Sequence, residues 1–239
     1  PPPPEFPDVL YFWDLLEGVS DRNPGVVNDD RLDCMILRFT GGTTGAPKAV
    51  MYSTDNFMAN RDLHFAMADP VAVRQERLLH FGMISHASGM VFFPVLFKGG
   101  CTLTMNDRSM LTFCSAVERE RVTASLMVPS MLYRMLDAPE VAKHDLSSLQ
   151  TMYYGASPMS PTRLKQLQQR FGNIFIQLYG SSEHAGAVSV LSKAEHMPDA
   201  SGSERVGKPV HPLVGLRKCV GCAGAFVDEA VSVSEPLCT

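Results

Sequence analysis

The residues with the most direct chemical potential stand together in one short stretch, 39–48, which reads FTGGTTGAPK. The stretch follows an apolar run and contains three glycines, three threonines and one lysine. Glycine lets the backbone turn tightly and bring its N–H groups close to phosphate oxygens, while threonine hydroxyls add donors and lysine adds positive charge. These are the groups that bind a triphosphate. The spacing differs from that of the G-x-x-x-x-G-K-[ST] loop, and composition alone is equally compatible with a flexible turn between strands.

The full string resembles the phosphate-loop signature of the adenylate-forming (AMP-binding) superfamily, which includes acyl-CoA synthetases, luciferases and the adenylation domains of peptide synthetases. Two later blocks occur in the order that this resemblance implies. Residues 154–158, YGASP, resemble the segment on the adenine side, and residues 177–183, QLYGSSE, are similar to the Y-G-x-T-E block. Each block follows an expected strand, and α/β sheets bind ligands at the carboxyl ends of their strands.

The resemblance implies a role for individual residues. Tyr179 would stack on adenine, Ser182 would contact the α-phosphate, and Glu183 would hold Mg²⁺. Ser182 stands where threonine is usual and keeps the hydroxyl group. Lys48, the Thr44 hydroxyl and a Mg²⁺ ion held by Glu183 would carry the chemistry by neutralising the negative charge that develops on the phosphates. The nucleotide site implied in this way comprises Thr40, Gly41, Gly42, Thr43, Thr44, Gly45, Lys48, Gly155, Ala156, Ser157, Pro158, Tyr179, Gly180, Ser181 and Ser182. Without the other blocks, Tyr179 and Glu183 would be interpreted as a core tyrosine and a surface glutamate.

A fourth segment, 81–90, reads FGMISHASGM and resembles the P-x-x-H-x-x-G segment of the superfamily, with Met83 where that pattern has proline. In that pattern the histidine lies between the acyl pocket and the thiol tunnel. The resemblance therefore implies that His86 gates substrate entry. The alternative is a packed, hydrogen-bonded core histidine, because a single histidine in an apolar stretch often has that role.

The reaction that the resemblance implies has two steps. A carboxylate attacks the α-phosphate of ATP, which releases pyrophosphate and leaves an acyl-adenylate. The thiol of coenzyme A then displaces AMP. The expected cofactors are ATP, Mg²⁺ and coenzyme A, and the expected partners are small molecules. The apolar run at 90–96 favours a fatty or other apolar acid, as in the fatty-acid–CoA ligase type of acyl-CoA synthetase.

Three alternatives stay open at this point. The first is an amino-acid-activating adenylation domain, for which Asp107 is the one nearby acidic residue that could hold the substrate amine. The second is a non-catalytic nucleotide-binding fragment. The third is a chain that does not fold stably alone and exposes apolar edges.

The elements that must position these residues alternate between short apolar runs and amphipathic segments, which predicts an α/β fold with mainly parallel sheets flanked by helices. By the resemblance, this fold is part of the large N-terminal domain of an adenylate-forming enzyme. Strands are expected at 35–39, 78–83, 101–105, 124–128, 151–154 and 174–179, the last clear strand, and helices at 53–68, 111–120, 131–136 and 161–171. Ser53 or Thr54 is expected to cap the first helix, and residues 207–216 could begin a short strand pair.

The organisation expected along the chain is a Pro-rich lead-in or truncated edge at 1–29, a partial AMP-binding domain at 30–215 and an irregular tail at 216–239, with the small C-terminal catalytic domain absent. The net charge of −4 and the scattered basic residues argue against nucleic-acid binding. The apolar stretch 87–97 contains Pro94 and is too short for a transmembrane segment. Cys219 and Cys222 have metal-ligand spacing but no second ligand pair, so a reducing, cytoplasmic setting is expected.

Overall fold

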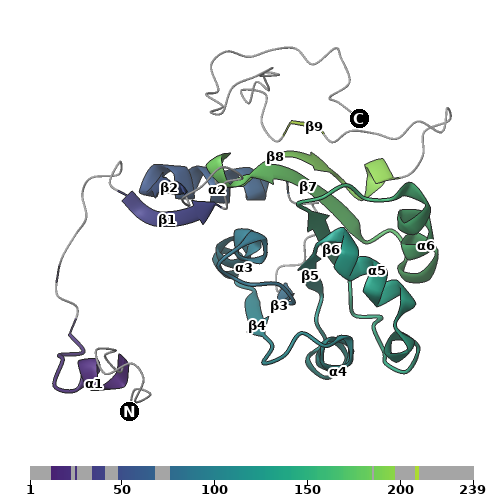
Figure 1. Ribbon diagram of the computed structural model, residues 1–239, viewed down its shortest axis with the longest axis horizontal. Helices are drawn as coiled ribbons and strands as arrows, with labels where there is room; N and C mark the ends of the chain where they lie inside the picture. Colours follow the sequence, from purple (N-terminus) through teal and green to yellow (C-terminus); the bar gives the residue numbers. More distant parts are fainter. Residues whose placement is uncertain are drawn as a thin grey trace.

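The structure is a computed structural model that describes residues 12–22, 25, 34–40, 48–67, 76–184, 186–196 and 208–209. The described residues form one small antiparallel sheet and one large mixed sheet (Figure 1). The small sheet is a hairpin of β1 (Cys34–Thr40) and β2 (Lys48–Ser53). The large sheet has the order β4-β3-β5-β6-β7-β8-β9. Its strands are β3 (Arg77–His80), β4 (Cys101–Thr104), β5 (Ala124–Met127), β6 (Thr151–Gly155), β7 (Phe175–Ser181), β8 (Gly186–Leu191) and β9 (Lys208–Pro209).

The strands from β4 to β7 run parallel to one another, whereas β8 and β9 are antiparallel. The chain leaves β3 for β4 on one side and then returns to β5 on the other side of β3. This reversal makes the gap between the carboxyl ends of β3 and β5 a topological switch point, the place where open α/β sheets bind ligands. The expected fold class, an α/β fold with a mainly parallel sheet flanked by helices, is confirmed.

Helices cover both faces of the large sheet. The 3₁₀ helix η1 (Ala87–Val91) and α3 (Phe92–Phe97) lie on one side, and α5 (Pro129–Asp137) and α6 (Pro161–Phe171) lie on the other (Figure 1). The remaining helices are α1 (Phe12–Leu16), α2 (Thr54–Met67), α4 (Met110–Glu120), η2 (Pro139–Ala142), η3 (Ser182–His184) and η4 (Ala194–His196). Within the described ranges, no helix is long and apolar enough to cross a membrane.

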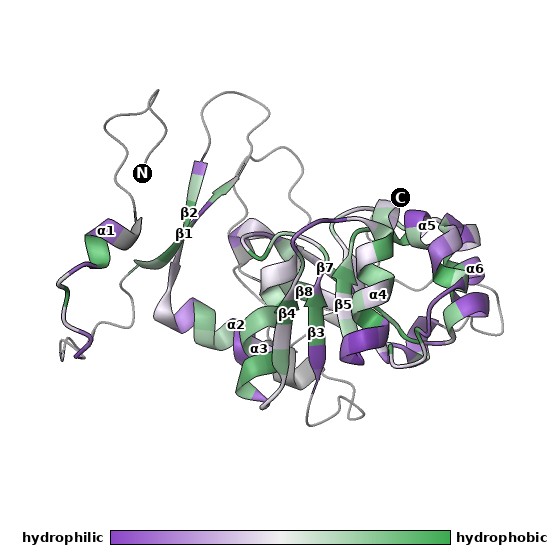
Figure 2. Ribbon diagram, turned by 90° about the horizontal axis from the view of Figure 1, so that it is seen from below, coloured by the Kyte–Doolittle hydropathy of each residue, from purple (hydrophilic) through white to green (hydrophobic). Residues whose placement is uncertain are grey.

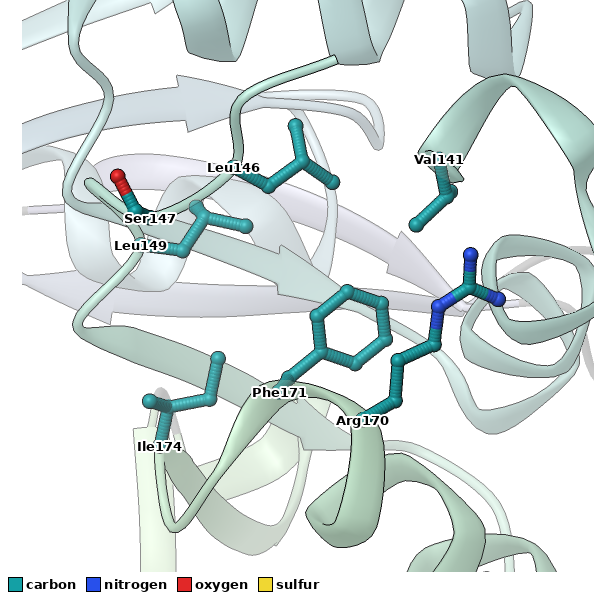
Figure 3. A pocket seen from close by; sticks show the side chains of 7 residues that line it. All are labelled: Val141, Leu146, Ser147, Leu149, Arg170, Phe171 and Ile174. Atoms are coloured by element: carbon teal, nitrogen blue, oxygen red, sulfur yellow. The ribbon is translucent and has the colours of Figure 1, made fainter. Parts of the chain in front are cut away.

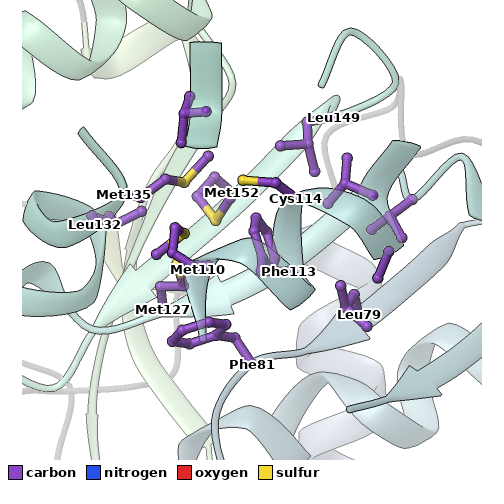
Figure 4. Close-up of a cluster of buried hydrophobic side chains, with 14 of the residues drawn as sticks. Leu79, Phe81, Met110, Phe113, Cys114, Met127, Leu132, Met135, Leu149 and Met152 are labelled. Atoms are coloured by element: carbon purple, nitrogen blue, oxygen red, sulfur yellow. The ribbon is translucent and has the colours of Figure 1, made fainter. Parts of the chain in front are cut away.

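Two hydrophobic clusters hold the large sheet between its helices. Side chains alternate along each strand, so that Leu79 of β3 joins one cluster and Leu78 joins the other. The first cluster lies under α4, α5 and α6 and includes Phe81 and Phe113 (Figure 4). The second includes Val95 of α3. In Figure 2, β5 and the middle of β3 are hydrophobic, one end of β3 is hydrophilic, and the helices carry both hydrophobic and hydrophilic residues along their length.

Local sequence explains where several helices begin and end. The Ser53 hydroxyl accepts a hydrogen bond from the Asn56 amide at 3.2 Å, so Ser53 caps α2 as expected. Prolines start α5 and α6, because the first turn of a helix does not need their missing N–H. Gly172, with φ of 80°, ends α6 in a positive-φ conformation that glycine adopts without strain.

The ten elements expected from the sequence are present within three residues at each end. Two strands were not predicted. β2 occupies residues that precede the expected helix, and β8 follows the strand at 174–179, so the expectation that this was the last clear strand is wrong. Every residue of β8 is buried, and a strand covered on both faces shows no polar–apolar alternation. Of the expected strand pair at 207–216, the structure describes only β9, and the tail at 216–239 lies outside the described residues.

Candidate active site

Three of the four sequence segments predicted for the site follow strands that end at the same edge of the large sheet. β3 leads into the segment with His86, β6 leads into Ala156–Pro158, and the carboxyl end of β7 carries Tyr179 and the residues after it. These strands are parallel, so their carboxyl ends meet at one edge. Gly155 pairs with Leu178, which brings the end of β6 beside Tyr179. The structure therefore brings these segments together.

The fourth segment is described only at its two flanks. Thr40 ends β1 and Lys48 begins β2, and the two residues are paired across the hairpin. The predicted loop between them belongs to this hairpin connection. Its predicted phosphate-binding residues, Gly41, Gly42, Thr43, Thr44 and Gly45, lie outside the described residues.

The turn after β6 has a backbone that few residues tolerate. A Cβ atom at Gly155 would overlap the carbonyl oxygen of Leu178, so only glycine fits the spacing between β6 and β7. Ala156 follows with φ of 66°, a left-handed conformation that L-residues rarely adopt. Ala156, Ser157 and Pro158 are exposed. Strained backbone of this kind is concentrated at ligand sites, where the surrounding structure enforces it.

The end of β7 presents an aromatic ring and a carboxylate to solvent. Tyr179 is 61% exposed, an unusual state for a large aromatic side chain, and its ring face is available to stack on a flat base. The pairing of β7 with β8 is irregular between Tyr179 and Gly180, and such irregularities redirect side chains. Ser181 and Glu183 are exposed and Ser182 is half-buried. These side chains are accessible to a ligand at this edge.

Two residues that the sequence reasoning missed connect the hairpin to this edge. The Tyr52 hydroxyl of β2 donates a hydrogen bond to the carbonyl oxygen of Ser182. The Arg38 guanidinium of β1 lies 5.7 Å from the centre of the Tyr52 ring and donates to the carbonyl oxygen of His86 at 3.4 Å. Burial raises the pKa of Tyr52, and the Glu183 carboxylate raises it further while Arg38 opposes the shift. No local sequence pattern marks these two residues, because their partners are distant along the chain.

The two histidines of the β3 segment have different environments. His86 is exposed, so the interpretation as a packed core histidine is wrong for it. That description fits His80 instead, which is buried at the end of β3 with Nδ1 2.7 Å from the Ser88 hydroxyl. Burial lowers the pKa of His80 and keeps its ring neutral. The gating role of His86 stays a prediction.

Two acidic residues, Glu183 and Asp107, are the candidates for holding a metal ion and a substrate amine, respectively. In the part of the chain that the structure describes, no three histidine, cysteine or acidic side chains gather where they could share a metal ion. A single exposed carboxylate such as Glu183 fits Mg²⁺, which is commonly held by one or two carboxylates together with substrate phosphates. Asp107 accepts hydrogen bonds from the Ser109 amide and the Thr112 hydroxyl, which lower its pKa. Asp107 therefore supports the first turn of α4.

A separate cavity lies at the opposite edge of the sheet. It has a volume of about 260 Å³ and is lined by residues that precede β6 and β7, together with the end of α6 (Figure 3). Five of the seven lining residues have apolar side chains, and Arg170 and Ser147 supply the polar side chains. Leu149 and Ile174 line it just before the amino ends of β6 and β7. The cavity is therefore not part of the candidate site.

Comparison with known proteins agrees with this geometry. The family model described as "AMP-binding enzyme" matches residues 5–217. The medium/long-chain-fatty-acid–CoA ligase FadD8 of Mycobacterium tuberculosis is 39% identical over 160 residues, which cover 67% of this chain and 28% of that protein. A feruloyl-CoA synthase of Amycolatopsis is 35% identical over 194 residues, with coverage of 80% and 38%. The chain thus spans less than two-fifths of the length of these relatives.

Solved structures share the fold. The amide bond synthetase McbA of Marinactinospora thermotolerans aligns with a TM-score of 0.61 and 31% identity, over 67% of this chain and 32% of that one. A fatty acyl CoA synthetase of Mycobacterium tuberculosis aligns with a TM-score of 0.68 over 77% of this chain and 36% of that one, and at 22% identity it shows the fold alone. Since the family model covers residues 5–217 of the 239, the chain belongs to the AMP-binding enzyme family.

Proposed function

We propose that this chain supplies the nucleotide and acid subsites of an enzyme that joins a carboxylic acid to coenzyme A at the expense of ATP. The observation that carries the proposal is the convergence at one sheet edge. The strained turn at Gly155–Ala156, the exposed Tyr179 ring, the Glu183 carboxylate and the hairpin anchored through Tyr52 all lie there. A purine, a phosphate chain and a cation need these groups close together.

The proposed reaction moves the acyl group in two steps. An oxygen of the carboxylate attacks the α-phosphorus of ATP, the bond to the β-phosphate oxygen breaks, and pyrophosphate leaves. The sulfur of coenzyme A then attacks the acyl carbon, and AMP leaves with the electron pair of the mixed anhydride. Bound Mg²⁺ would neutralise charge on the phosphates. Lys48, the 41–46 amides and the Thr44 hydroxyl would add fixed positive charge and donors, and Glu183 would hold the cation.

The proposed acid is a fatty acid or another apolar acid. The segment after His86 forms η1 and α3, in which Val91 and Val95 are buried while Phe93 and Leu96 are partly exposed. Such a wall favours a hydrocarbon chain or ring. The relative named as a fatty-acid–CoA ligase supports the first choice, and the one named as a feruloyl-CoA synthase supports an aryl acid as the second. His86 is proposed to gate the acid subsite, so His86→Ala should change the preference among acids.

Acid-dependent exchange between ATP and pyrophosphate tests the first step. The purified chain is assayed with fatty, aryl and amino acids, and its binding of Mg·ATP is measured by calorimetry. Exchange with a fatty acid supports the proposal, whereas exchange with amino acids alone would replace it by the amino-acid-activating alternative. Binding of Mg·ATP without exchange would indicate a nucleotide-binding chain that does not perform the first half-reaction.

Matched variants test the residues. Lys48→Ala and Glu183→Gln should each weaken Mg·ATP binding roughly ten- to a hundred-fold, the range of one lost charge-assisted hydrogen bond. The controls are Lys165→Ala and Glu17→Gln, which change exposed residues outside the candidate site. If the two site variants bind Mg·ATP as tightly as their controls, the assignment of Lys48 and Glu183 is wrong.

A further inference from the structure

The β1–β2 hairpin contacts the candidate site through one of its two faces, the face that carries Arg38 and Tyr52. Leu37, Phe39 and Met51 are exposed on the outward face. Arg38 pairs with Val50, and Ile36 pairs with Tyr52, so Arg38 and Tyr52 are diagonal neighbours on the other face. The distance of 5.7 Å between the guanidinium carbon and the ring centre is within the range of a cation–π contact.

Tyr52 joins the hairpin to the end of β7. Its side chain is 5% exposed, and its hydroxyl donates to the Ser182 carbonyl. Since the pKa of Tyr52 is raised, the hydroxyl keeps its proton and remains a donor at neutral pH. The acceptor lies directly before Glu183, so this hydrogen bond fixes the backbone that carries the proposed cation ligand.

Arg38 extends the connection to the turn that carries His86. The His86 carbonyl accepts from Arg38 at 3.4 Å and from the Gly89 amide at 3.0 Å. A Cβ atom at Gly89 would overlap the carbonyl oxygen of Ile84, which shows how tight this turn is. A displacement of the guanidinium therefore acts on a turn that has little room to absorb it.

We propose that Arg38 is a positioning residue that couples the nucleotide subsite to the acid subsite. A continuous series of contacts runs from Ser182 through the Tyr52 hydroxyl and ring and the Arg38 guanidinium to His86. The hairpin also holds Thr40 and Lys48 at the flanks of the predicted phosphate loop, so nucleotide that fixes the hairpin also fixes the His86 turn. Such coupling is reciprocal, so a bound acid tightens nucleotide binding by the same factor. The ligands named here rest on the proposed function, whereas the contacts do not.

The first test needs no ligand. Amide hydrogen exchange is measured for peptides that span residues 83–90 and 180–184 in the parent chain, Arg38→Met, Arg38→Lys and Tyr52→Phe. Arg38→Met should speed exchange in 83–90 about fivefold or more, the factor for one ordinary hydrogen bond, and Tyr52→Phe should do so in 180–184. Arg38→Lys keeps the charge, so it should restore part of the protection and should fold even if Arg38→Met does not.

The matched controls are Arg163→Met and Tyr133→Phe. Arg163 also lies 5.7 Å from a tyrosine ring, that of Tyr133, whose hydroxyl accepts from the Ser160 amide. This pair joins α5 and α6, away from the hairpin, so neither control should alter exchange in the two peptides. Unchanged exchange in Arg38→Met and Arg38→Lys, or an equal rise in the controls, would overturn the positioning role.

The second test measures the coupling itself. The dissociation constant of dodecanoate is determined by calorimetry with and without the Mg²⁺ complex of α,β-methylene-ATP, which cannot release pyrophosphate and so prevents turnover. In the parent chain the nucleotide complex should tighten dodecanoate binding, and Arg38→Met should reduce the ratio of the two dodecanoate dissociation constants at least about threefold. A structural defect without coupling would weaken both dissociation constants equally and leave their ratio unchanged. A factor of one in the parent chain, or an unchanged factor in Arg38→Met, overturns the coupling. If the parent chain binds no Mg·ATP, the proposed function fails, and the exchange experiment decides the positioning role alone.

Discussion

The centre of the large sheet and the β1–β2 hairpin are held in different ways. Every residue from Ala124 to Met127 of β5 is buried, as are the first four residues of β6, between helices on both faces. The hairpin leaves Leu37 at 55%, Phe39 at 66% and Met51 at 69% exposure. Its described contacts with the candidate site are the polar ones of Tyr52 and Arg38.

This difference suggests that the large sheet and the hairpin contribute differently to the candidate site. The large sheet supplies strand ends whose positions are fixed by packing on both faces. The hairpin carries the flanks of the predicted phosphate loop and leaves several apolar side chains exposed, and segments with few buried apolar contacts open locally at low free energy. A nucleotide would therefore order the hairpin against an edge that is already in place.

The largest expected effect is the difference in the free energy of unfolding between a substitution in the core and one on the surface of the hairpin. Phe113 is fully buried in the first cluster, with its ring 5.5 Å from that of Phe81 and nearly perpendicular to it. Phe113→Ala should lower the free energy of unfolding by about 3–5 kcal/mol, because it removes apolar burial and leaves a cavity. Phe39→Ala on the exposed face should change it by about 0.5 kcal/mol or less. Urea unfolding measures both, and equal losses would contradict the comparison.

The next largest effect is expected where the backbones of β6 and β7 lie closest together, at Gly155. Gly155→Ala places a methyl group against the Leu178 carbonyl, which belongs to a paired strand and cannot move away easily. The expected loss is about 1–3 kcal/mol, together with weaker Mg·ATP binding. Gly82→Ala is the control, because its Cβ would meet only the Ser88 Cβ at an ordinary 3.5 Å. A tolerated Gly155→Ala would show that the β6–β7 edge is as adaptable as the hairpin.

The two regions should also differ in their response to pH. His196 is buried, accepts from the Tyr154 hydroxyl through Nε2 and donates through Nδ1 to the Ser192 carbonyl, so it is neutral in the fold. Burial lowers its pKa, whereas the unfolded chain takes up the proton near the ordinary pKa of about 6.5. Its contribution to stability is therefore complete above that pH and is lost as the pH falls through the folded pKa. Between pH 7.5 and 5.5, unfolding experiments should show a smaller loss in His196→Gln than in the parent chain.

The hairpin should respond at the alkaline end instead. The pKa of Tyr52 is raised, so the fold favours its protonated form. Its contribution is present below the ordinary pKa of about 10 and is lost as the pH rises through the folded value. Hydrogen exchange in 180–184 should therefore lose protection at high pH, beyond the intrinsic pH effect, in the parent chain but not in Tyr52→Phe. The same loss in both proteins would contradict this assignment.

The smallest effect concerns a surface ion pair. Arg163 of α6 makes two contacts with Asp137 at the end of α5, at 2.8 and 2.9 Å, and both side chains are partly exposed. Arg163→Met should cost no more than about 1 kcal/mol, and less at high salt, because water and ions screen the attraction. A loss as large as that of Phe113→Ala would show that charge rather than packing holds the helical layer.

Much of the fold follows from local pattern. The helix at 161–171 matches its predicted bounds because Pro161 opens it, Gly172 ends it and its apolar residues recur at helical spacing. β8 was missed because GAVSVL, buried along its whole length, shows neither a strand nor a helix period. The hairpin partner β2 was missed although a turn between strands was one interpretation of the preceding loop, because KAVMYS has one buried residue and no clear alternation of polar and apolar residues.

The sequence predicted which segments form the candidate site, but it did not predict the side-chain contacts between them. Motif order placed Tyr179, Glu183 and Gly155 at strand ends, and the parallel register brings those ends to one edge. Arg38 and His86 are 48 residues apart, and Tyr52 and Ser182 are 130 apart. A contact at that separation depends on the packed arrangement of β1, β2 and β7, which no window of the sequence encodes. The roles of the individual site residues stay predictions.

The left-handed backbone of Ala156 has a consequence for any attempt to improve this protein. An L-residue in that conformation costs about 1–2 kcal/mol, which a glycine would avoid. The position is thus locally frustrated, since the side chain and the required backbone disagree. A library selected for thermal resistance alone would tend to replace Ala156 and relax the turn beside the exposed tyrosine. Screens for stability and for ligand binding should therefore diverge first at this residue.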